Sequence, residues 1–184
     1  MNITPTALLF IFGIAFIMIG GINPLQVMSG EETSLSGDKT LEARLKKLEA
    51  REEIRQLLMD YGRFVDQRDF ASFSELFAKN DGEWIGGFGR ARGSKAIREL
   101  MESNLGTGAP KTYSCHLFSN EMINVNGDKA TAITKWIFVV PGESNRPQMF
   151  FLGHYEDTMI REDGRWKFLC RTVHADIPAD DQIK

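Results

Sequence analysis

Cysteine and histidine, the residues that most often bind metals, are scarce in this sequence. The 184 residues include two cysteines and three histidines. Two cysteines can build neither a disulfide framework nor a four-cysteine zinc site. The chain also has no Cys-x-x-Cys or His-x-x-x-His spacing, so we expect no dedicated metal site.

An excess of basic residues is also absent. The chain has 22 Lys and Arg against 25 Asp and Glu, for a net charge of -3, and its pI is about 5.7. Nucleic-acid-binding proteins usually carry a basic patch, so we expect no nucleic-acid partner. The hydrophobic fraction of 42% is ordinary for a globular domain and argues against disorder.

Charged residues are missing altogether from residues 1–30. Apolar residues and glycine fill Ala7–Ile22, which suits the apolar region of a signal peptide and is slightly short for a membrane-spanning helix of about 20 residues. We expect residues 1–29 to be an export signal cleaved before Gly30 or an uncleaved membrane anchor. Both alternatives place the domain outside the cytoplasm. A cleaved signal would export it to the periplasm or the cell exterior, and an uncleaved segment would anchor it to a membrane by this segment alone.

Residues 30–40 are polar and rich in Ser and Gly, which predicts a linker, and residues 41–184 form the predicted domain. Apolar residues at helical spacing predict a long helix over Leu41–Val65. Asp69 is a predicted N-cap for a second helix over Phe70–Ala78. After a glycine-rich short strand and turn within Lys79–Gly93, a third helix, capped by Ser94, covers Ser94–Asn104.

After Pro110 the apolar period changes from helical to alternating, which predicts strands over Thr112–Val125, Lys129–Val140, Met149–Arg161 and Arg165–Ala175. Asn126-Gly127 and Asp163-Gly164 are turn signals between them. In the last strand Trp166, Phe168 and Cys170 alternate with Lys167, Leu169 and Arg171. The element order predicts an α+β fold in which three N-terminal helices pack on a curved, mainly antiparallel sheet.

Several short strings in this order carry a family resemblance. They are Tyr61-Gly-Arg-Phe-Val-Asp66, Leu76-Phe77, Gly93-Ser-Lys-Ala-Ile97, Cys115-His116-Leu, Gly127-Asp-Lys-Ala-Thr131, Gly153-His-Tyr-Glu-Asp157 and Asp163-Gly-Arg-Trp-Lys-Phe168. From about Leu48 to Ile177 the chain resembles the SnoaL-like family of the nuclear transport factor 2-like superfamily. Its members include scytalone dehydratase, hexachlorocyclohexane dehydrochlorinase and polyketide cyclases.

The resemblance implies a cone-shaped fold around one deep, mainly apolar pocket. It maps a carboxylate of the first helix and a histidine of the first long strand onto Asp66 and His116, a pair that acts as a general base in the family's dehydratases and dehydrohalogenases. It therefore implies a cofactor-independent lyase or isomerase acting on a small apolar molecule. The second strand histidine of scytalone dehydratase has no equivalent near Val139 here, which argues against that enzyme's own chemistry.

The residues themselves leave alternatives open. Helical periodicity alone places Asp66 on the flank of the apolar stripe or at the helix end, where it would be a solvated or capping carboxylate. His116 shares strand parity with Phe118 and Met122 and so faces the interior, where it is either a packed core histidine or a catalytic one.

Tyr61, Trp84 and Tyr155 are either core aromatics or walls of a substrate-binding pocket. His154 has the opposite strand parity to Tyr155 and should face away from that pocket, and His174 is expected at the surface or an interface.

Other functions of the same fold remain open. The chain could be a non-catalytic small-molecule-binding or assembly domain, or a cyclase with a larger substrate. The resemblance implies a homodimer formed through the open sheet face. Cys115 and Cys170 lie on different predicted strands and could be free thiols or a disulfide pair.

Overall fold

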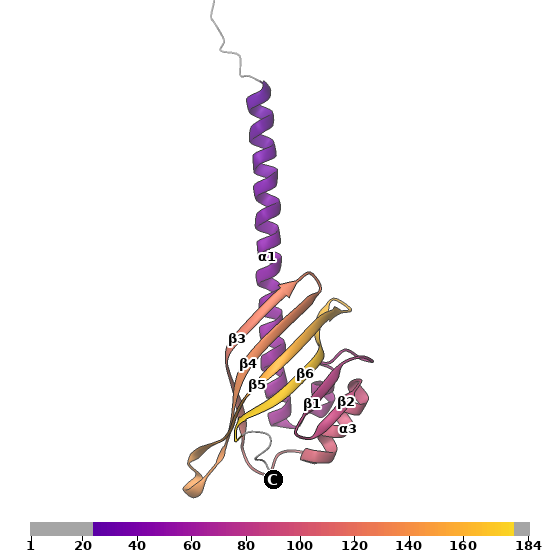
Figure 1. Cartoon of the computed structure of the whole chain (residues 1–184), viewed down its shortest axis with the longest axis vertical. Helices are drawn as coiled ribbons and strands as arrows, with labels where there is room; N and C mark the ends of the chain where they lie inside the picture. The colour runs from indigo at the N-terminus through magenta and orange to yellow at the C-terminus, as the bar shows by residue number, and fades with distance from the viewer. Residues whose placement is uncertain (1–23, 179–184) are drawn as a thin grey trace, which may run out of the picture. The chain divides into compact units, whose positions relative to one another are not determined.

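The computed structural model describes residues 24–178, with side chains described from residue 37. Three α-helices, a short 3-10 helix and six strands follow one another (Figure 1). They are α1 (Pro24–Gln67), α2 (Phe70–Ser74), β1 (Glu83–Gly86), β2 (Gly89–Arg92), α3 (Ser94–Leu105), β3 (Cys115–Asn126), β4 (Lys129–Pro141), η1 (Glu143–Asn145), β5 (Pro147–Glu162) and β6 (Arg165–Ile177). Helices and a sheet of this kind make the α+β fold that the sequence predicts.

The first helix is longer than predicted. By internal contacts the chain divides into two units, residues 1–42 and 43–184, and α1 contributes to both. The predicted linker, residues 30–40, is helical. Pro24 occupies the first turn, where proline is tolerated, and the next proline is Pro110, so no residue with a blocked amide interrupts the helix. Serine and glycine reduce helix propensity without preventing a helix.

The membrane-related predictions meet the structure only in part. The segment Ala7–Ile22, interpreted as an export signal or anchor, lies outside the described residues. Within residues 24–178 no helix combines the length and the apolar character that crossing a membrane requires. Cys115 and Cys170 are both free thiols, on strands separated by β4 and β5.

The six strands form one open sheet in the order β2-β1-β6-β5-β4-β3. The four long strands make the predicted antiparallel meander and lie side by side against the C-terminal part of α1 in Figure 1. The hairpin β1–β2 extends the sheet by a parallel pairing of β1 with β6. The core lies between the inner sheet face and the helices, where Ile54 and Leu58 of α1 pack with Trp136 and Met159.

Irregular pairing changes which side chains face this core. Met159 of β5 lies opposite Phe168 while the preceding Thr158 lies opposite Cys170, so Leu169 is an extra residue in β6. An extra residue reverses the alternation beyond it. The prediction that Arg171 faces away from Phe168 is therefore wrong: both side chains are fully buried.

A second irregularity lies in β3. The register shifts between Ser119 and Met122, and Asn120 adopts a positive φ of 54°. His116 and Phe118 face inward as predicted, but Met122 is 63% exposed. Its predicted place on the interior face is wrong, because Asn120 and Glu121 lie opposite the single residue Thr134, and this one extra residue reverses the parity.

Candidate functional site

The end of α1 is set by a left-handed residue. Arg68 has a φ of 58°, its amide donates to the carbonyl of Val65, and the amide of Asp69 donates to the carbonyl of Phe64. This is the hydrogen-bond pattern of a Schellman helix stop. The carboxylate of Asp69 then accepts the amide of Ser72 and caps α2, as predicted, although α2 is shorter than expected. The stop leaves Asp66 in the last turn of α1.

Asp66 binds His116 through both of its carboxylate oxygens. Oδ1 lies 2.6 Å from Nδ1 of the imidazole, and Oδ2 accepts the His116 backbone amide at 2.9 Å. The two side chains are each 18% exposed. An ionised carboxylate can only accept, so Nδ1 carries the hydrogen, and in the neutral imidazole Nε2 has the lone pair. The structure thus brings together the two residues that the resemblance pairs.

This position of Asp66 is not explained by helix stability. A carboxylate in the last helical turn faces the negative end of the helix dipole. The compensating interactions come from β3, an edge strand whose outward amides have no neighbouring strand to bond. Gly62, one turn earlier, lets the helix approach, because a Cβ there would meet the Phe118 ring at 2.7 Å. Sequence and packing therefore hold the carboxylate against His116.

His116 lines a cavity of about 300 Å³. Phe138 packs against the imidazole with ring centres 4.6 Å apart, and Trp136 lies at 6.1 Å. Thirteen further residues line the cavity, almost all of them apolar or aromatic: Tyr61, Val65, Trp84, Gly87, Phe88, Met101, Leu105, Trp136, Phe138, Phe151, Tyr155, Val173 and Ala175. Asp66 does not line this cavity but a neighbouring groove that His116 also borders. Only the imidazole of the pair therefore faces the apolar cavity.

The three aromatic residues named from the sequence all line the cavity. Trp84 donates its indole N–H to the Tyr61 hydroxyl at 3.0 Å, and the Tyr61 and Tyr155 rings lie 5.4 Å apart edge to face. Burial raises the pKa of the Tyr61 hydroxyl above its ordinary value and raises the pKa of Tyr155 well above it. Both hydroxyls therefore stay protonated at neutral pH and can donate hydrogen bonds.

A buried cation, Arg171, lies behind these tyrosines, on the face opposite to the one predicted for it. The Arg171 guanidinium is 4.0 Å from the centre of the Tyr61 ring and 4.2 Å from that of Tyr155. It donates to both oxygens of Asp157, at 2.7 and 2.8 Å. Burial favours a lower pKa for Arg171, but the Asp157 charge and hydrogen bonds outweigh burial and raise it. Arg171 therefore stays charged and fixes the tyrosine rings.

The remaining two histidines lie on the other side of the sheet. His154 does not line the cavity, and its ring stacks on that of His174 with centres 4.6 Å apart. His154 thus faces away from Tyr155, as its strand parity predicts. Phe138 and Trp136, which frame His116, were not singled out from the sequence, although their strand pairing with β3 is the signal that could have found them.

Comparisons with known proteins agree with this architecture. A family model described as SnoaL-like domain matches residues 46–172. This range includes Asp66, His116, Arg171 and every cavity residue except Val173 and Ala175. An uncharacterized protein of Mycobacterium tuberculosis, Rv2910c, is 29% identical over 124 residues, covering 65% of this chain and 80% of the relative.

Solved structures give the same result. An NTF2-like protein with a cystatin-like fold from Novosphingobium aromaticivorans has a TM-score of 0.66 and 29% identity, covering 75% of this chain and 89% of the other. LinA has a TM-score of 0.61 and 25% identity, with 72% and 89% covered. The hexachlorocyclohexane dehydrochlorinase LinA-type3 from Novosphingobium barchaimii has a TM-score of 0.59 and 24% identity, with 72% and 90% covered. The resemblance named from the sequence is confirmed.

Proposed function

Since this chain belongs to the SnoaL-like domain family, which includes lyases, dehydrochlorinases and cyclases, we propose that it is a cofactor-independent lyase or isomerase for a small apolar molecule. The observation that carries the proposal is the Asp66–His116 pair, with 2.6 Å between Oδ1 and Nδ1, beside the apolar cavity. A histidine oriented by a carboxylate is a general-base unit.

In the proposed reaction His116 Nε2 accepts a proton from carbon, while Nδ1–H stays bonded to Asp66. The carboxylate stabilises the imidazolium that forms, and because both side chains are only 18% exposed, solvent screens this interaction less than it would at the surface. The electron pair of the broken C–H bond forms a double bond. In an elimination a leaving group such as halide departs from the neighbouring carbon with its own bonding pair. In an isomerisation His116 returns the proton to a different carbon.

The cavity favours a small substrate. About 300 Å³ is at the low end of ligand cavities, so a single-ring molecule suits it better than the larger substrate of a ring-forming cyclase. Its walls are aromatic, and the lining residues that carry polar side-chain atoms are His116, Tyr61, Tyr155, Trp84 and Trp136. The substrate is accordingly apolar, with at most one or two groups that accept a hydrogen bond.

A panel of probes tests this function. The full chain is incubated with hexachlorocyclohexane, with chloride release as the readout, and with small cyclic ketones in D₂O, with exchange of the protons next to the carbonyl followed by NMR. Binding of each probe is measured in parallel by its effect on the unfolding temperature.

Turnover of at least one probe, saturable with concentration, supports the enzyme. Probes that bind and stabilise the chain without reacting would instead support the rival function, a non-catalytic binding domain. If no probe of the panel binds or reacts, the proposal that the cavity binds a small apolar molecule is contradicted.

A further inference from the structure

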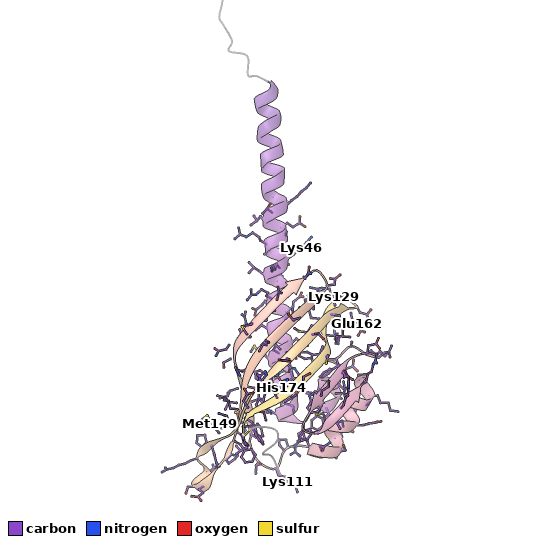
Figure 2. All side chains as sticks on the ribbon, in the orientation of Figure 1. Lys46, Lys111, Lys129, Met149, Glu162 and His174 are labelled. Carbon is purple, nitrogen blue, oxygen red and sulfur yellow. The ribbon has the colours of Figure 1, made fainter. Side chains whose placement is uncertain are left out.

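Two histidines and a glutamate meet on the outer face of the sheet, opposite to the cavity. His154 and Glu156 are two residues apart on β5 and so share a face. His174 on β6 lies directly across from His154 in the strand register, and Figure 2 labels it on that strand. We call His154, Glu156 and His174 the outer histidine cluster. None of the three lines the cavity.

The ligand-type atoms of this cluster converge. One nitrogen from each ring and one oxygen of Glu156 all lie within 4.8 Å of one another. Nε2 of His154 is 4.0 Å from Oε1 of Glu156, and Nε2 of His174 is 3.6 Å from Oε2. Two ligands bound tetrahedrally at about 2.0–2.1 Å from Zn²⁺ lie roughly 3.4 Å apart. Small side-chain rotations would therefore suffice to bring the three atoms around one ion.

Hydrogen bonding prepares the His154 ring for such a role. Nδ1 of His154 lies 2.8 Å from Oδ1 of Asp176. The ionised carboxylate accepts a hydrogen bond from Nδ1–H, so in the neutral ring the lone pair is on Nε2. A carboxylate behind a histidine is the usual outer partner of a metal-binding imidazole. Lys135 holds the other Asp176 oxygen at 2.8 Å, which fixes the carboxylate in place.

One nitrogen at the centre of the cluster has no hydrogen-bond partner in the described part of the chain. Nε2 of His174 is buried and has no hydrogen-bond partner among the described residues. With neutral rings, the carboxylates of Glu156 and Asp176 outnumber the single cation Lys135. Glu156 is 59% exposed along its side chain, so an ion can enter from solvent. Electron-pair donors gathered this closely are stabilised by a shared cation.

We propose that the outer histidine cluster binds one divalent transition-metal ion of the Zn²⁺ class. His154 Nε2, His174 Nε2 and a Glu156 carboxylate oxygen are its ligands, and Asp176 orients His154. Three protein ligands leave the fourth position of a tetrahedral ion open to water or another ligand. The site lies on the opposite sheet face from the Asp66–His116 pair, so it is independent of the proposed reaction.

Zinc binding to the full, metal-free chain tests the proposal, measured at neutral pH by competition with a chromophoric chelator. Co²⁺ supplies a second readout, because its visible absorption reports a tetrahedral site. We expect one ion per chain and a higher unfolding temperature with metal. The variants His174→Gln and Glu156→Gln should lose this binding, and Asp176→Asn should weaken it by about 10–100-fold. Because the ligands bind without their protons, affinity should fall as the pH is lowered.

The third histidine provides the matched control. His116→Gln removes an imidazole of the other sheet face and should leave both stoichiometry and affinity unchanged. The proposal is overturned if the wild-type chain shows no saturable Zn²⁺ binding up to about 100 μM. It is equally overturned if Zn²⁺ binding persists in His174→Gln.

Discussion

At the scale of single residues, the geometry of the site is set by the hydrogen bonds of the Asp66 carboxylate. The two oxygens of Asp66 have separate tasks: one fixes the ring of His116, and the other fixes its backbone. The same carboxylate therefore orients the imidazole and ties the end of α1 to β3. A substitution that keeps the shape but removes the charge separates these tasks.

Asp66→Asn should lower the rate of proton abstraction by at least about 100-fold, the lower range for positioned acid–base help. The amide oxygen can still accept one hydrogen bond from His116, so the unfolding midpoint in urea should change much less than the rate. Asp60→Asn on the same helix is the control, since the hydrogen bonds of the Asp60 carboxylate within the described part of the chain go to neighbouring Gln56 and Arg63. Equal rates in wild type and Asp66→Asn would contradict the role given to Asp66.

Because its tyrosines are buried, the folded chain should lose stability at alkaline pH. Because burial raises the pKa of Tyr155 in the folded state, the unfolded chain loses this proton first as the pH rises through about 10. The contribution of the protonated Tyr155 to the free energy of unfolding is complete below that pH and is lost progressively above it. Urea unfolding at neutral pH and above pH 10 should show a smaller alkaline loss in Tyr155→Phe than in wild type.

Tyr113→Phe is the matched control, because Tyr113 is 79% exposed. It should keep the full alkaline loss of the wild-type chain. If both variants lose stability equally on raising the pH, the buried tyrosine is not the cause.

At the scale of elements, strand register decides which side chains reach the core. The strands and the first helix can be predicted from apolar period, and the turns from Asn-Gly and Asp-Gly. The faces cannot be predicted throughout, because the extra residues in β3 and β6 reverse the alternation. Met122 and Arg171 were misplaced for this reason, and no local pattern in the sequence marks either irregularity.

Asp157 of β5 and Arg171 of β6 face each other across the strands and form an ion pair. Both side chains are fully buried, so Asp157→Asn leaves a buried cation without its counter-charge. We expect a loss of about 3–5 kcal/mol in the free energy of unfolding, measured by urea denaturation.

The double variant Asp157→Leu/Arg171→Met removes both charges and should recover much of that loss, because a buried ion pair itself adds little net stability. A double variant as unstable as the sum of its single variants would show that the two charges do not act as a pair.

At the scale of the whole molecule, the sheet has two chemically different faces. The inner face and the helices surround the apolar cavity beside His116, and the outer face carries the outer histidine cluster. The fold and the dyad could be anticipated by family resemblance, since helical periodicity alone leaves Asp66 on a flank. The outer cluster could not, because its histidines are 20 residues apart and meet only through the register of β5 and β6.

The central claim is that His116 is the base that removes a proton from a molecule in the cavity. The most direct measurement compares the proton-abstraction rate of wild type and His116→Gln on a probe that the wild type turns over, with probe affinity measured on the same preparations. We predict a rate at least about 100-fold lower in the variant, with probe affinity and unfolding midpoint close to those of wild type. A variant that binds the probe and turns it over at the wild-type rate would contradict the claim.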